Sequence, residues 1–217
     1  KAYNQPTKNI CLTPSGMNAV YCALRGLKTI QNQNGKNKLI QLGWLYLDTM
    51  NIVEHYFEEN KIFYDITNLD LLEDYLKING HTISAIVTEI PTNPLLQTVD
   101  LPRLKNLCLK YNIVLVIDAT FATPFNLDLK PYADIYVESL TKFACGNADV
   151  LMGAVILNEN SKISMISQEF FKHADEPYIK DIQRLALEIK NYKNRINQIK
   201  ATSLISTNNK YGKICVV

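Results

Sequence analysis

The chain has 217 residues, with 23 basic and 21 acidic side chains and a formal net charge of +2. Hydrophobic residues make up 47% of the chain, which excludes a disordered protein, and the balanced charge excludes polyanion binding by bulk electrostatics. No apolar run approaches the roughly 18 residues of a membrane span, and the N-terminus lacks the features of a signal peptide. The composition predicts a soluble globular protein with one large domain or two small ones.

The cysteines predict neither a disulfide framework nor a zinc site. Their number is odd, and none stands in a C-x-x-C pair. The five positions are Cys11, Cys22, Cys108, Cys145 and Cys215. We expect reduced thiols that pack as small apolar side chains in a cytoplasmic protein. The three histidines are scattered along the chain, and we predict no metal site.

Short β-branched runs alternate along the chain with longer segments of helical period. Helices are predicted over residues 17–27, 48–58, 69–78 and 102–110, and strands over 38–42, 61–64, 83–88, 113–117, 135–137 and 152–157. An exposed loop is predicted at residues 31–38, and a helical segment is predicted over residues 161–201. A poorly structured tail is predicted over residues 203–217. Strands that alternate with helices of this length predict an α/β fold with a mostly parallel sheet and flanking helices.

Polar residues follow several of the predicted strands. Asn93, Asp118 and Lys142 each come after a strand, and Ser15-Gly16-Met17 opens the first long helix. Ligands of open α/β sheets bind at the carboxyl ends of the strands, and a helix N-terminus binds anions. Taken singly, these residues are typical of caps, turns and surface charges. Their order and spacing together carry the functional signal.

Four motifs occur in a characteristic order. They are Thr-Pro-Ser-Gly-Met at 13–17, Glu-Ile-Pro-Thr-Asn-Pro at 89–94, Asp-Ala-Thr-Phe-Ala-Thr-Pro at 118–124 and Ser-Leu-Thr-Lys-Phe at 139–143. This series resembles the Cys/Met metabolism family of pyridoxal 5'-phosphate (PLP) enzymes, from about residue 13 to about residue 200. The family includes cystathionine γ-synthase, cystathionine β- and γ-lyases and O-acylhomoserine sulfhydrylases. The resemblance implies the large domain of PLP fold type I, the aspartate aminotransferase-like fold.

The resemblance implies a catalytic role for Lys142 and Tyr46. Lys142 matches the Schiff-base lysine, which also serves as the base that moves protons between Cα and the cofactor. Asp118 matches the partner of the pyridine nitrogen, and Asn93 the residue that hydrogen-bonds the ring hydroxyl. Tyr46 falls at the position of a Tyr that stacks on the cofactor ring, although Leu47 stands where the family has Gly.

The same resemblance implies a phosphate site. Gly16 and Met17 match the backbone N–H groups that face the phosphate at a helix N-terminus. Ser139 and Thr141 match hydroxyl donors to the same phosphate, and their i, i+2 spacing places both on one side of an extended segment. Residues 147 and 148 are Asn and Ala, where the family often has His-Ser. We expect this departure to alter only hydrogen bonds of residues that support the site without contacting the cofactor.

The function implied is that of a PLP-dependent lyase or transferase of transsulfuration, in methionine biosynthesis or cysteine metabolism. Such an enzyme carries out β- or γ-elimination or γ-replacement on cystathionine or an O-acylhomoserine. The partners implied are a small amino-acid substrate and further copies of the chain, in a dimer or tetramer, with no nucleic acid and no membrane.

Family members are about twice this long. We therefore interpret residues 1–202 as the PLP-binding large domain without the N-terminal arm, and 203–217 as a tail without the C-terminal small domain. Arg184 and Arg195 are interpreted as a solvated helix face.

A second hypothesis is a truncated or degenerate homologue that is catalytically incompetent and acts only as a PLP-binding or interaction domain. The intact Lys142 and Asp118 oppose it. A nucleotide-binding α/β protein lacks support, because neither glycine-rich phosphate motif is present.

Overall fold

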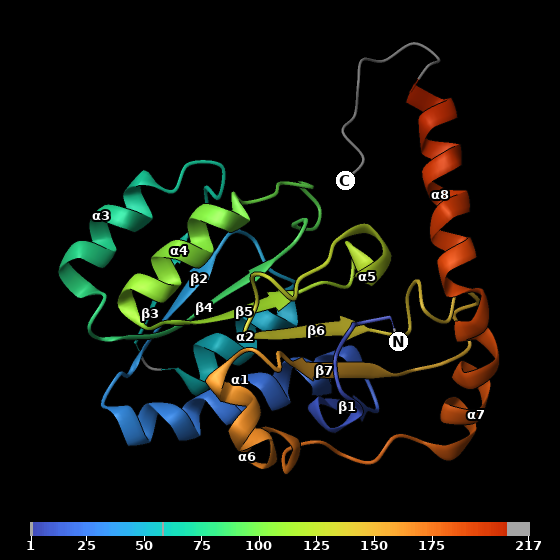
Figure 1. The fold of residues 1–217 in the computed structure, drawn as a ribbon, viewed down its shortest axis with the longest axis horizontal. Helices are drawn as coiled ribbons and strands as arrows, with labels where there is room; N and C mark the ends of the chain where they lie inside the picture. Colours follow the sequence, from blue (N-terminus) through green and yellow to red (C-terminus); the bar gives the residue numbers. More distant parts are fainter. Residues whose placement is uncertain (1, 58, 208–217) are drawn as a thin grey trace.

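A seven-stranded sheet forms the centre of the molecule, in the order β1-β7-β6-β5-β4-β2-β3 (Figure 1). The computed structural model describes residues 2–57 and 59–207. The strands are Ile10–Thr13 (β1), Lys38–Leu42 (β2), Glu59–Phe63 (β3), Ile83–Glu89 (β4), Val114–Asp118 (β5), Ile135–Ser139 (β6) and Gly153–Leu157 (β7). The strands from β6 to β3 run parallel, and β7 is antiparallel to both of its neighbours. The predicted mostly parallel sheet is confirmed.

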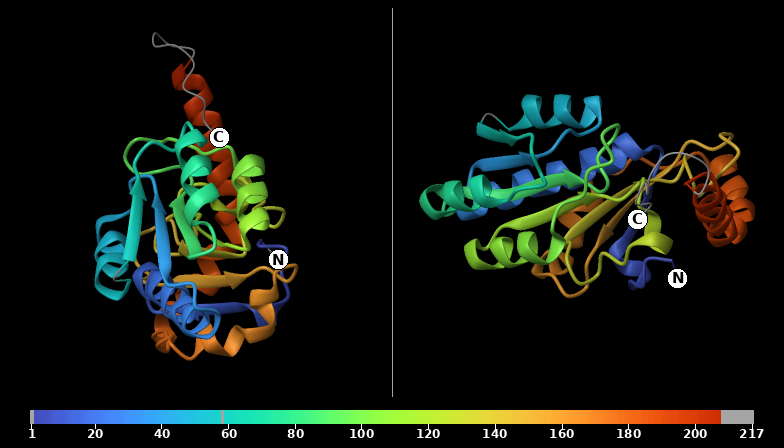
Figure 2. Two further views of the ribbon diagram at one scale, coloured as in Figure 1. Left: turned by 90° about the vertical axis from the view of Figure 1, so that its left-hand side faces the viewer. Right: turned by 90° about the horizontal axis from the view of Figure 1, so that it is seen from above.

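Helices cover both faces of this sheet (Figures 1 and 2). They are α1 (Gly16–Asn34), α2 (Leu47–Tyr56), α3 (Asp70–Asn79), α4 (Leu101–Tyr111), α5 (Thr123–Asn126), α6 (Ser167–Phe171), α7 (Ile179–Glu188) and α8 (Tyr192–Thr207). Short 3-10 turns lie at Thr7–Asn9, Lys162–Ile166 and Ile189–Asn191. Side chains of α1, α2 and α6 share one apolar cluster, and those of α3, α4, α7 and α8 share the other. These two layers are the α/β arrangement that the sequence predicted.

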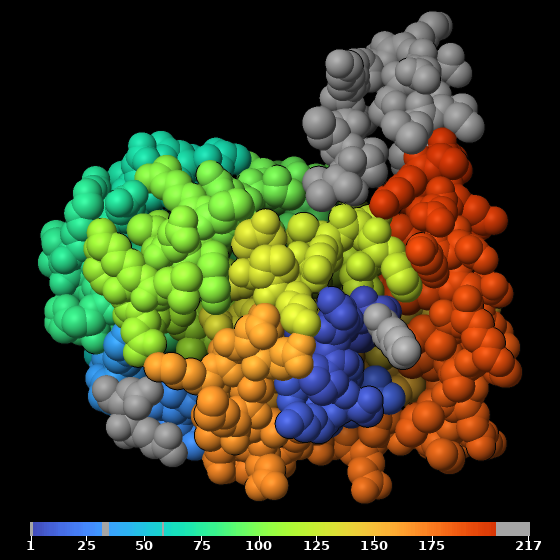
Figure 3. Space-filling view, viewed as in Figure 1, coloured from blue at the N-terminus to red at the C-terminus, as the bar shows by residue number. Residues whose placement is uncertain are grey.

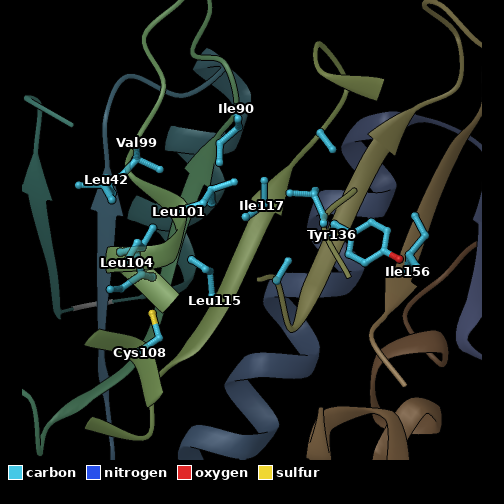
Figure 4. Close-up of a cluster of buried hydrophobic side chains, with 14 of the residues drawn as sticks. Leu42, Ile90, Val99, Leu101, Leu104, Cys108, Leu115, Ile117, Tyr136 and Ile156 are labelled. Carbon is cyan, nitrogen blue, oxygen red and sulfur yellow. The ribbon is translucent and has the colours of Figure 1, made fainter. Parts of the chain in front are cut away.

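The core lies between the helices and the sheet (Figure 4). Every residue of β4 and of β7 is buried, as is typical of strands that are covered on both faces. Leu104 of α4 and Ile117 of β5 belong to the same buried cluster. This burial explains why the inner strands read as nearly continuous apolar runs in the sequence.

Strand β1 is an element that sequence analysis did not predict. It pairs antiparallel with β7, from Ile10 opposite Ile156 to Thr13 opposite Gly153. Its four residues do not alternate between buried and exposed positions, so they lack the two-residue period that is typical of a strand. The partner strand therefore decides its conformation, as is common for edge strands.

Helix α1 is longer than predicted. It continues to Asn34, and Gly35 ends it at a φ of +67°, a left-handed conformation that glycine adopts without strain. The predicted loop at residues 31–38 is therefore wrong over its first half. Gln31 is buried despite its polar side chain, and its Nε2 donates to Ser84 Oγ at 2.6 Å. This tertiary contact holds the last helical turn against the sheet.

The predicted helical segment 161–201 is interrupted. An irregular stretch at residues 172–178 contains Pro177 and separates α6 from α7. Proline removes a backbone donor and clashes with the preceding turn, so it ends a helix. Helix α8 continues to Thr207, so the predicted tail is helical over residues 203–207, and its remaining residues, 208–217, lie outside the described residues.

The N-terminal segment meets the start of α8 beside β6. Tyr3 and Tyr192 both donate through their hydroxyls to the buried carboxylate of Glu138, at 2.6 Å and 2.5 Å. Figure 3 shows the first residues on the surface between the segment before α6 and the α7–α8 pair. Burial is the main cause that raises the pKa of Glu138 to about 7, and the two tyrosine hydroxyls oppose that shift.

The cysteines of the described residues are free thiols. Cys22, Cys108 and Cys145 are buried and Cys11 is partly buried, whereas Cys215 lies outside the described residues. Burial raises the pKa of the Cys22 and Cys108 thiols to about 12. Within residues 2–57 and 59–207, no helix combines the length and the apolar character that a membrane crossing requires.

Candidate active site

Polar side chains stand at the carboxyl ends of three neighbouring strands. Glu89 ends β4, Asp118 ends β5 and Ser139 ends β6. Glu89 and Asp118 are partners in the β4–β5 register, and Ser139 is the partner of Gly153 at the start of β7. The sheet therefore brings two carboxylates and a hydroxyl to one edge, where open α/β sheets bind their ligands.

A cavity of about 290 Å³ lies at this edge. It is lined by Ser15, Gly16, Met17, Val20, Tyr46, Glu89, Pro91, Asn93, Asp118, Thr120, Phe121, Ser139, Thr141, Lys142 and Leu151. All eight of the site residues that sequence analysis predicted are among them. The structure thus brings together residues that are spread over more than half of the chain.

The N-terminus of α1 forms one wall of the cavity. Ser15 is the N-cap, and its side chain accepts from the Asn18 N–H at 3.0 Å. Among the described residues, no hydrogen-bond acceptor is found for the N–H groups of Gly16 and Met17. A Cβ on Gly16 would lie 2.6 Å from the Cβ of Ser139, so only glycine permits this approach of α1 to β6. Free N–H groups at a helix N-terminus suit an anionic ligand.

Asp118 forms the floor of the cavity together with Thr120. The Thr120 N–H donates to Asp118 Oδ1 at 2.8 Å, and the Thr120 hydroxyl oxygen accepts from the Ser139 N–H at 2.8 Å. Burial raises the pKa of Asp118, and the hydrogen bonds from Thr120 oppose that rise. Thr120 therefore links the end of β5 to the end of β6 and fixes the carboxylate in place.

Glu89 is a second carboxylate of the site. Its Oε1 accepts from the Tyr46 N–H, and its Oε2 accepts from the Asn93 N–H at 3.4 Å. Burial is the main cause that raises the pKa of Glu89 to about 7, the charge of Asp118 adds to it, and the two backbone donors oppose it. Glu89 thus ties together two loops, one carrying Tyr46 and the other carrying Asn93.

Lys142 lies in a series of tight turns after β6. Its N–H donates to the Ser139 carbonyl at 3.2 Å, and its own carbonyl accepts from the Gly146 N–H at 2.9 Å. Thr141 donates through its hydroxyl to the Met152 carbonyl at 3.3 Å and accepts from the Met152 N–H at 3.1 Å. The hydroxyl of Thr141 therefore already has protein partners, whereas no hydrogen bond of the Ser139 hydroxyl is found within the described part of the chain.

Sequence analysis missed Glu89, Thr120 and Phe121 as cavity residues. The first two had a detectable signal, because Glu89 ends a predicted strand just as Asp118 does, and Thr120 lies between two motif residues. Phe121 had no detectable signal, since an aromatic residue after a strand is as typical of a core position as of a cavity wall. Its 44% exposure and its place in the cavity wall are tertiary facts.

The interpretation of Arg195 as part of a solvated helix face is wrong. Its guanidinium donates to the carbonyls of Phe143 and Ala144, directly after Lys142. Arg184 is more exposed, and it pairs with Asp149 at 2.8 Å. Both arginines contact the segment that follows Lys142, so α7 and α8 hold this side of the site.

The fold is that of PLP-dependent enzymes of fold type I. Among solved structures, it is similar to a putative O-acetylhomoserine (thiol)-lyase from Campylobacter jejuni, at a TM-score of 0.71 and 20% identity. The match covers 88% of this chain and 58% of that one, whose structure contains a pyridoxyl-lysine phosphate. At this identity the similarity shows the fold alone.

The chain belongs to the Cys/Met metabolism PLP-dependent enzyme family, whose model matches residues 5–205. It is 35% identical over 196 residues to the L-2-amino-4-chloropent-4-enoate dechlorinase/desaturase of Streptantibioticus cattleyicolor, covering 89% of this chain and 39% of that protein. It is 32% identical over 207 residues to the cystathionine gamma-synthase of Neurospora crassa, covering 92% of this chain and 33% of that protein. The chain thus spans between a third and two fifths of the length of these relatives. The family and its cofactor, PLP, agree with the resemblance noted in the sequence.

Proposed function

We propose that this chain carries the cofactor-binding half of the active site of a PLP-dependent enzyme acting on a sulfur amino acid. The observation that supports it is the common cavity, in which a lysine, a buried carboxylate, a free helix N-terminus and an exposed tyrosine meet. The reaction class proposed is β- or γ-elimination or γ-replacement on cystathionine or an O-acylhomoserine.

The residues around the cavity fit PLP in their chemistry. The phosphate would be held by the N–H groups of Gly16 and Met17 and by the Ser139 hydroxyl. The close approach of Gly16 to Ser139 places backbone and hydroxyl donors together, which a side chain at position 16 would prevent. Thr141 belongs to the same proposed phosphate site, and its existing bonds with Met152 give it a second use, in orienting the segment before Lys142.

The remaining proposed roles follow from charge and position. Asp118 would hold a positive charge on the pyridine nitrogen, and Asn93 would bind the ring hydroxyl. Tyr46 would cover one face of the ring and exclude water from it. Lys142 would anchor the cofactor covalently, and once the amino group of the substrate has displaced it, its free amine would take the proton from Cα of the substrate. PLP itself supplies the electron sink that stabilises the negative charge left at Cα.

The names of two relatives favour chemistry at the γ-carbon of the substrate. One relative is named a cystathionine gamma-synthase, and the other acts on a 2-amino acid that bears chlorine at carbon 4, which is the γ-carbon. We therefore propose γ-elimination or γ-replacement ahead of β-elimination. The proton that Lys142 removes from Cα would be the first of two that such a reaction needs.

We also propose that the working unit is a homo-oligomer, a dimer or tetramer, that binds a small amino-acid substrate. Large apolar side chains at the cavity rim support this proposal, since Leu151 is 58% and Tyr46 is 51% exposed. Apolar surface beside a cavity is typical of a protein interface. Sedimentation velocity of the chain, with and without PLP, would report the oligomeric state.

The test is the visible absorbance spectrum of the purified chain with PLP, before and after borohydride reduction. We expect an absorption band from lysine-bound PLP, and borohydride should then fix the cofactor covalently to the peptide that contains Lys142. Lys142→Ala should lack both. Lys77→Ala is the matched control, because Lys77 is an exposed lysine that pairs with Asp74 on α3.

Turnover is assayed next, as release of a 2-oxo acid from cystathionine and from O-acylhomoserine for elimination, and as release of the carboxylic acid from O-acylhomoserine in the presence of a thiol for γ-replacement. Turnover that is lost in Lys142→Ala would support the proposed enzyme. Binding of PLP with no turnover on any of these substrates would favour the alternative, a PLP-binding domain without activity. A wild-type band that survives in Lys142→Ala would contradict the assigned role of Lys142.

A further inference from the structure

The segment that follows Lys142 is held by its own backbone on one side only. The Cys145 N–H donates to the Leu140 carbonyl at 2.9 Å, and the Gly146 N–H donates to the Lys142 carbonyl at 2.9 Å. Neither bond uses the carbonyls of Phe143 and Ala144. Something outside the segment must satisfy them, because they are at least partly buried.

Arg195 of α8 provides these donors. Its Nε donates to the Phe143 carbonyl at 3.2 Å, and its Nη2 donates to the Ala144 carbonyl. The same Nη2 donates to the Glu188 carbonyl at 3.0 Å, and Nη1 lies 3.5 Å from the Glu188 carboxylate. The Arg195 side chain is only 21% exposed. A planar guanidinium holds two adjacent carbonyls and a third group in one fixed geometry, whereas the donors of a lysine ammonium rotate freely.

Gly146 provides independent evidence that the chain is built to admit this arginine. Its φ is +79°, and a Cβ at this position would lie 2.5 Å from Nε of Arg195. A residue with a side chain would be strained at this φ and would also displace the guanidinium. The glycine therefore gives Arg195 access to the two carbonyls.

A second arginine strengthens the same attachment. Arg184 Nε lies 2.8 Å from Asp149 Oδ2, and its Nη2 lies 2.8 Å from Glu188 Oε1. The Cys145 thiol donates to Asp149 Oδ1 at 3.1 Å. Glu188 thus joins the two arginines, and the segment 143–149 is tied to α7 and α8 at both of its ends.

We propose that Arg195 is a positioning residue for Lys142. Arg195 fixes the backbone after that lysine, so the direction in which the Lys142 amine points depends on the position of α8. This inference deepens the proposed function and rests on Lys142 as the lysine that anchors PLP. A reacting group must be held within a fraction of an ångström of its productive position, and errors of about 1 Å cost on the order of a hundredfold in rate. The three backbone carbonyls that Arg195 holds meet this need.

The first test uses the chain without PLP. Arg195→Met and Gly146→Ala are compared with wild type by hydrogen exchange of residues 143–147 and by the rate at which acetic anhydride labels Lys142. We expect at least a tenfold faster exchange of the Cys145 and Gly146 amides in both variants, and several-fold faster labelling of Lys142. Arg103→Met is the matched control, because Arg103 forms two ion pairs far from this segment, with Asp70 and Glu73.

The second test adds PLP and follows the band of lysine-bound cofactor against pH. Arg195→Met should weaken PLP binding about tenfold and shift the pH midpoint of the band, whereas Arg103→Met should change neither. Arg195→Lys should restore only part of what Arg195→Met loses, because the ammonium keeps N–H donors but lacks the rigid planar fork of the guanidinium.

Unchanged exchange and labelling in folded Arg195→Met would overturn the inference. Faster exchange with an unchanged pH midpoint would also overturn it, since Arg195 would then be structural only. Absence of the band from wild type would contradict the proposed function, and the measurements without PLP would still decide whether Arg195 positions Lys142.

Discussion

Two buried glutamates on neighbouring regions of the sheet perform different tasks. Glu89 ends β4 and accepts hydrogen bonds from the backbone of the loops that carry Tyr46 and Asn93. Glu138 on β6 accepts from the hydroxyls of Tyr3, near the N-terminus, and Tyr192, at the start of α8. For both carboxyls burial is the main cause that raises the pKa to about 7, and Asp118 adds to it. Two carboxyls with similarly raised pKa values therefore have different roles. Glu89 organises the loops of the site, and Glu138 attaches the N-terminal segment to α8.

The partners of each carboxylate explain the difference. Backbone N–H donors belong to loops, so a carboxylate that binds them sets loop geometry. Tyrosine hydroxyls stand at the tips of long side chains, so a carboxylate that binds them joins elements that are distant in sequence. We therefore expect changes at Glu138 to affect stability and changes at Glu89 to affect cofactor binding.

The largest expected effect is on stability, in Glu138→Met. The substitution leaves two buried tyrosine hydroxyls without their acceptor, which costs about 3 kcal/mol of the free energy of unfolding. Urea denaturation followed by circular dichroism measures it. Glu54→Met, an exposed change on α2, should cost less than about 0.5 kcal/mol. A loss below about 1 kcal/mol in Glu138→Met would show that the attachment of the N-terminal segment to the start of α8 does not depend on this carboxylate.

The second prediction is the pH dependence of stability. A carboxyl whose pKa is higher in the folded chain than in the unfolded chain binds its proton more tightly when folded. The free energy of unfolding should therefore fall as pH rises from 4.5 to about 7, and then level off. A shift of this size corresponds to about 3 kcal/mol per carboxyl. Glu138→Gln and Glu89→Gln should each remove part of this slope, and an unchanged slope in both would contradict the assignment.

The third prediction separates the two carboxylates by function. Glu89→Gln keeps one oxygen acceptor and loses the other, so the loops of Tyr46 and Asn93 are no longer both held. We expect PLP binding to weaken about tenfold, which corresponds to about 1.4 kcal/mol, with little change in the free energy of unfolding at pH 5, where the Glu89 carboxyl of the folded chain is protonated. Titration of the PLP absorbance measures it. Glu138→Gln is the matched variant, and its affinity for PLP should stay at the wild-type value. Equal losses in both would break the distinction between the two glutamates.

The smallest expected effect is that of Thr120→Val, which keeps the shape of the side chain and removes its hydroxyl. The Ser139 N–H then loses its acceptor, and Asp118 keeps the backbone donor of residue 120. We expect a loss of about 1 kcal/mol in stability and a smaller loss of PLP affinity than in Glu89→Gln. Thermal unfolding and PLP titration measure the two. An affinity loss larger than that of Glu89→Gln would make Thr120, rather than Glu89, the main organiser of the site.

Much of this site could be predicted from the sequence because its residues follow strands. Asp118 and Ser139 end consecutive parallel strands, and the carboxyl ends of such strands meet at one edge. Gly16 and Met17 could be placed because they follow a cap residue at the start of a long helix and belong to a motif of the family. Their convergence on one cavity agrees with that reading, while the role of each residue toward PLP stays a prediction.

The sequence could not show the contacts that depend on a distant partner. Arg195 looks like any other charged residue of a polar helix, and its contact with the Phe143 carbonyl joins positions that are 52 residues apart. Strand β1 has too few residues to carry a period, and only β7 gives it a conformation. The last turns of α1 were hidden for the same reason, because Gln31 is buried through a bond to Ser84.

The sequence by itself determined the alternation of strands and helices, the family, and eight of the fifteen residues that line the cavity, because local period and motif order are properties of the chain. Tertiary structure decided which groups support those residues. Glu89, Thr120 and Arg195 act through backbone atoms of segments remote in sequence, and a backbone N–H or carbonyl is the same at every position. Only folding determines which of these identical groups a side chain meets. The sequence therefore shows that Glu89 and Thr120 follow predicted strands, but not which backbone groups they bind.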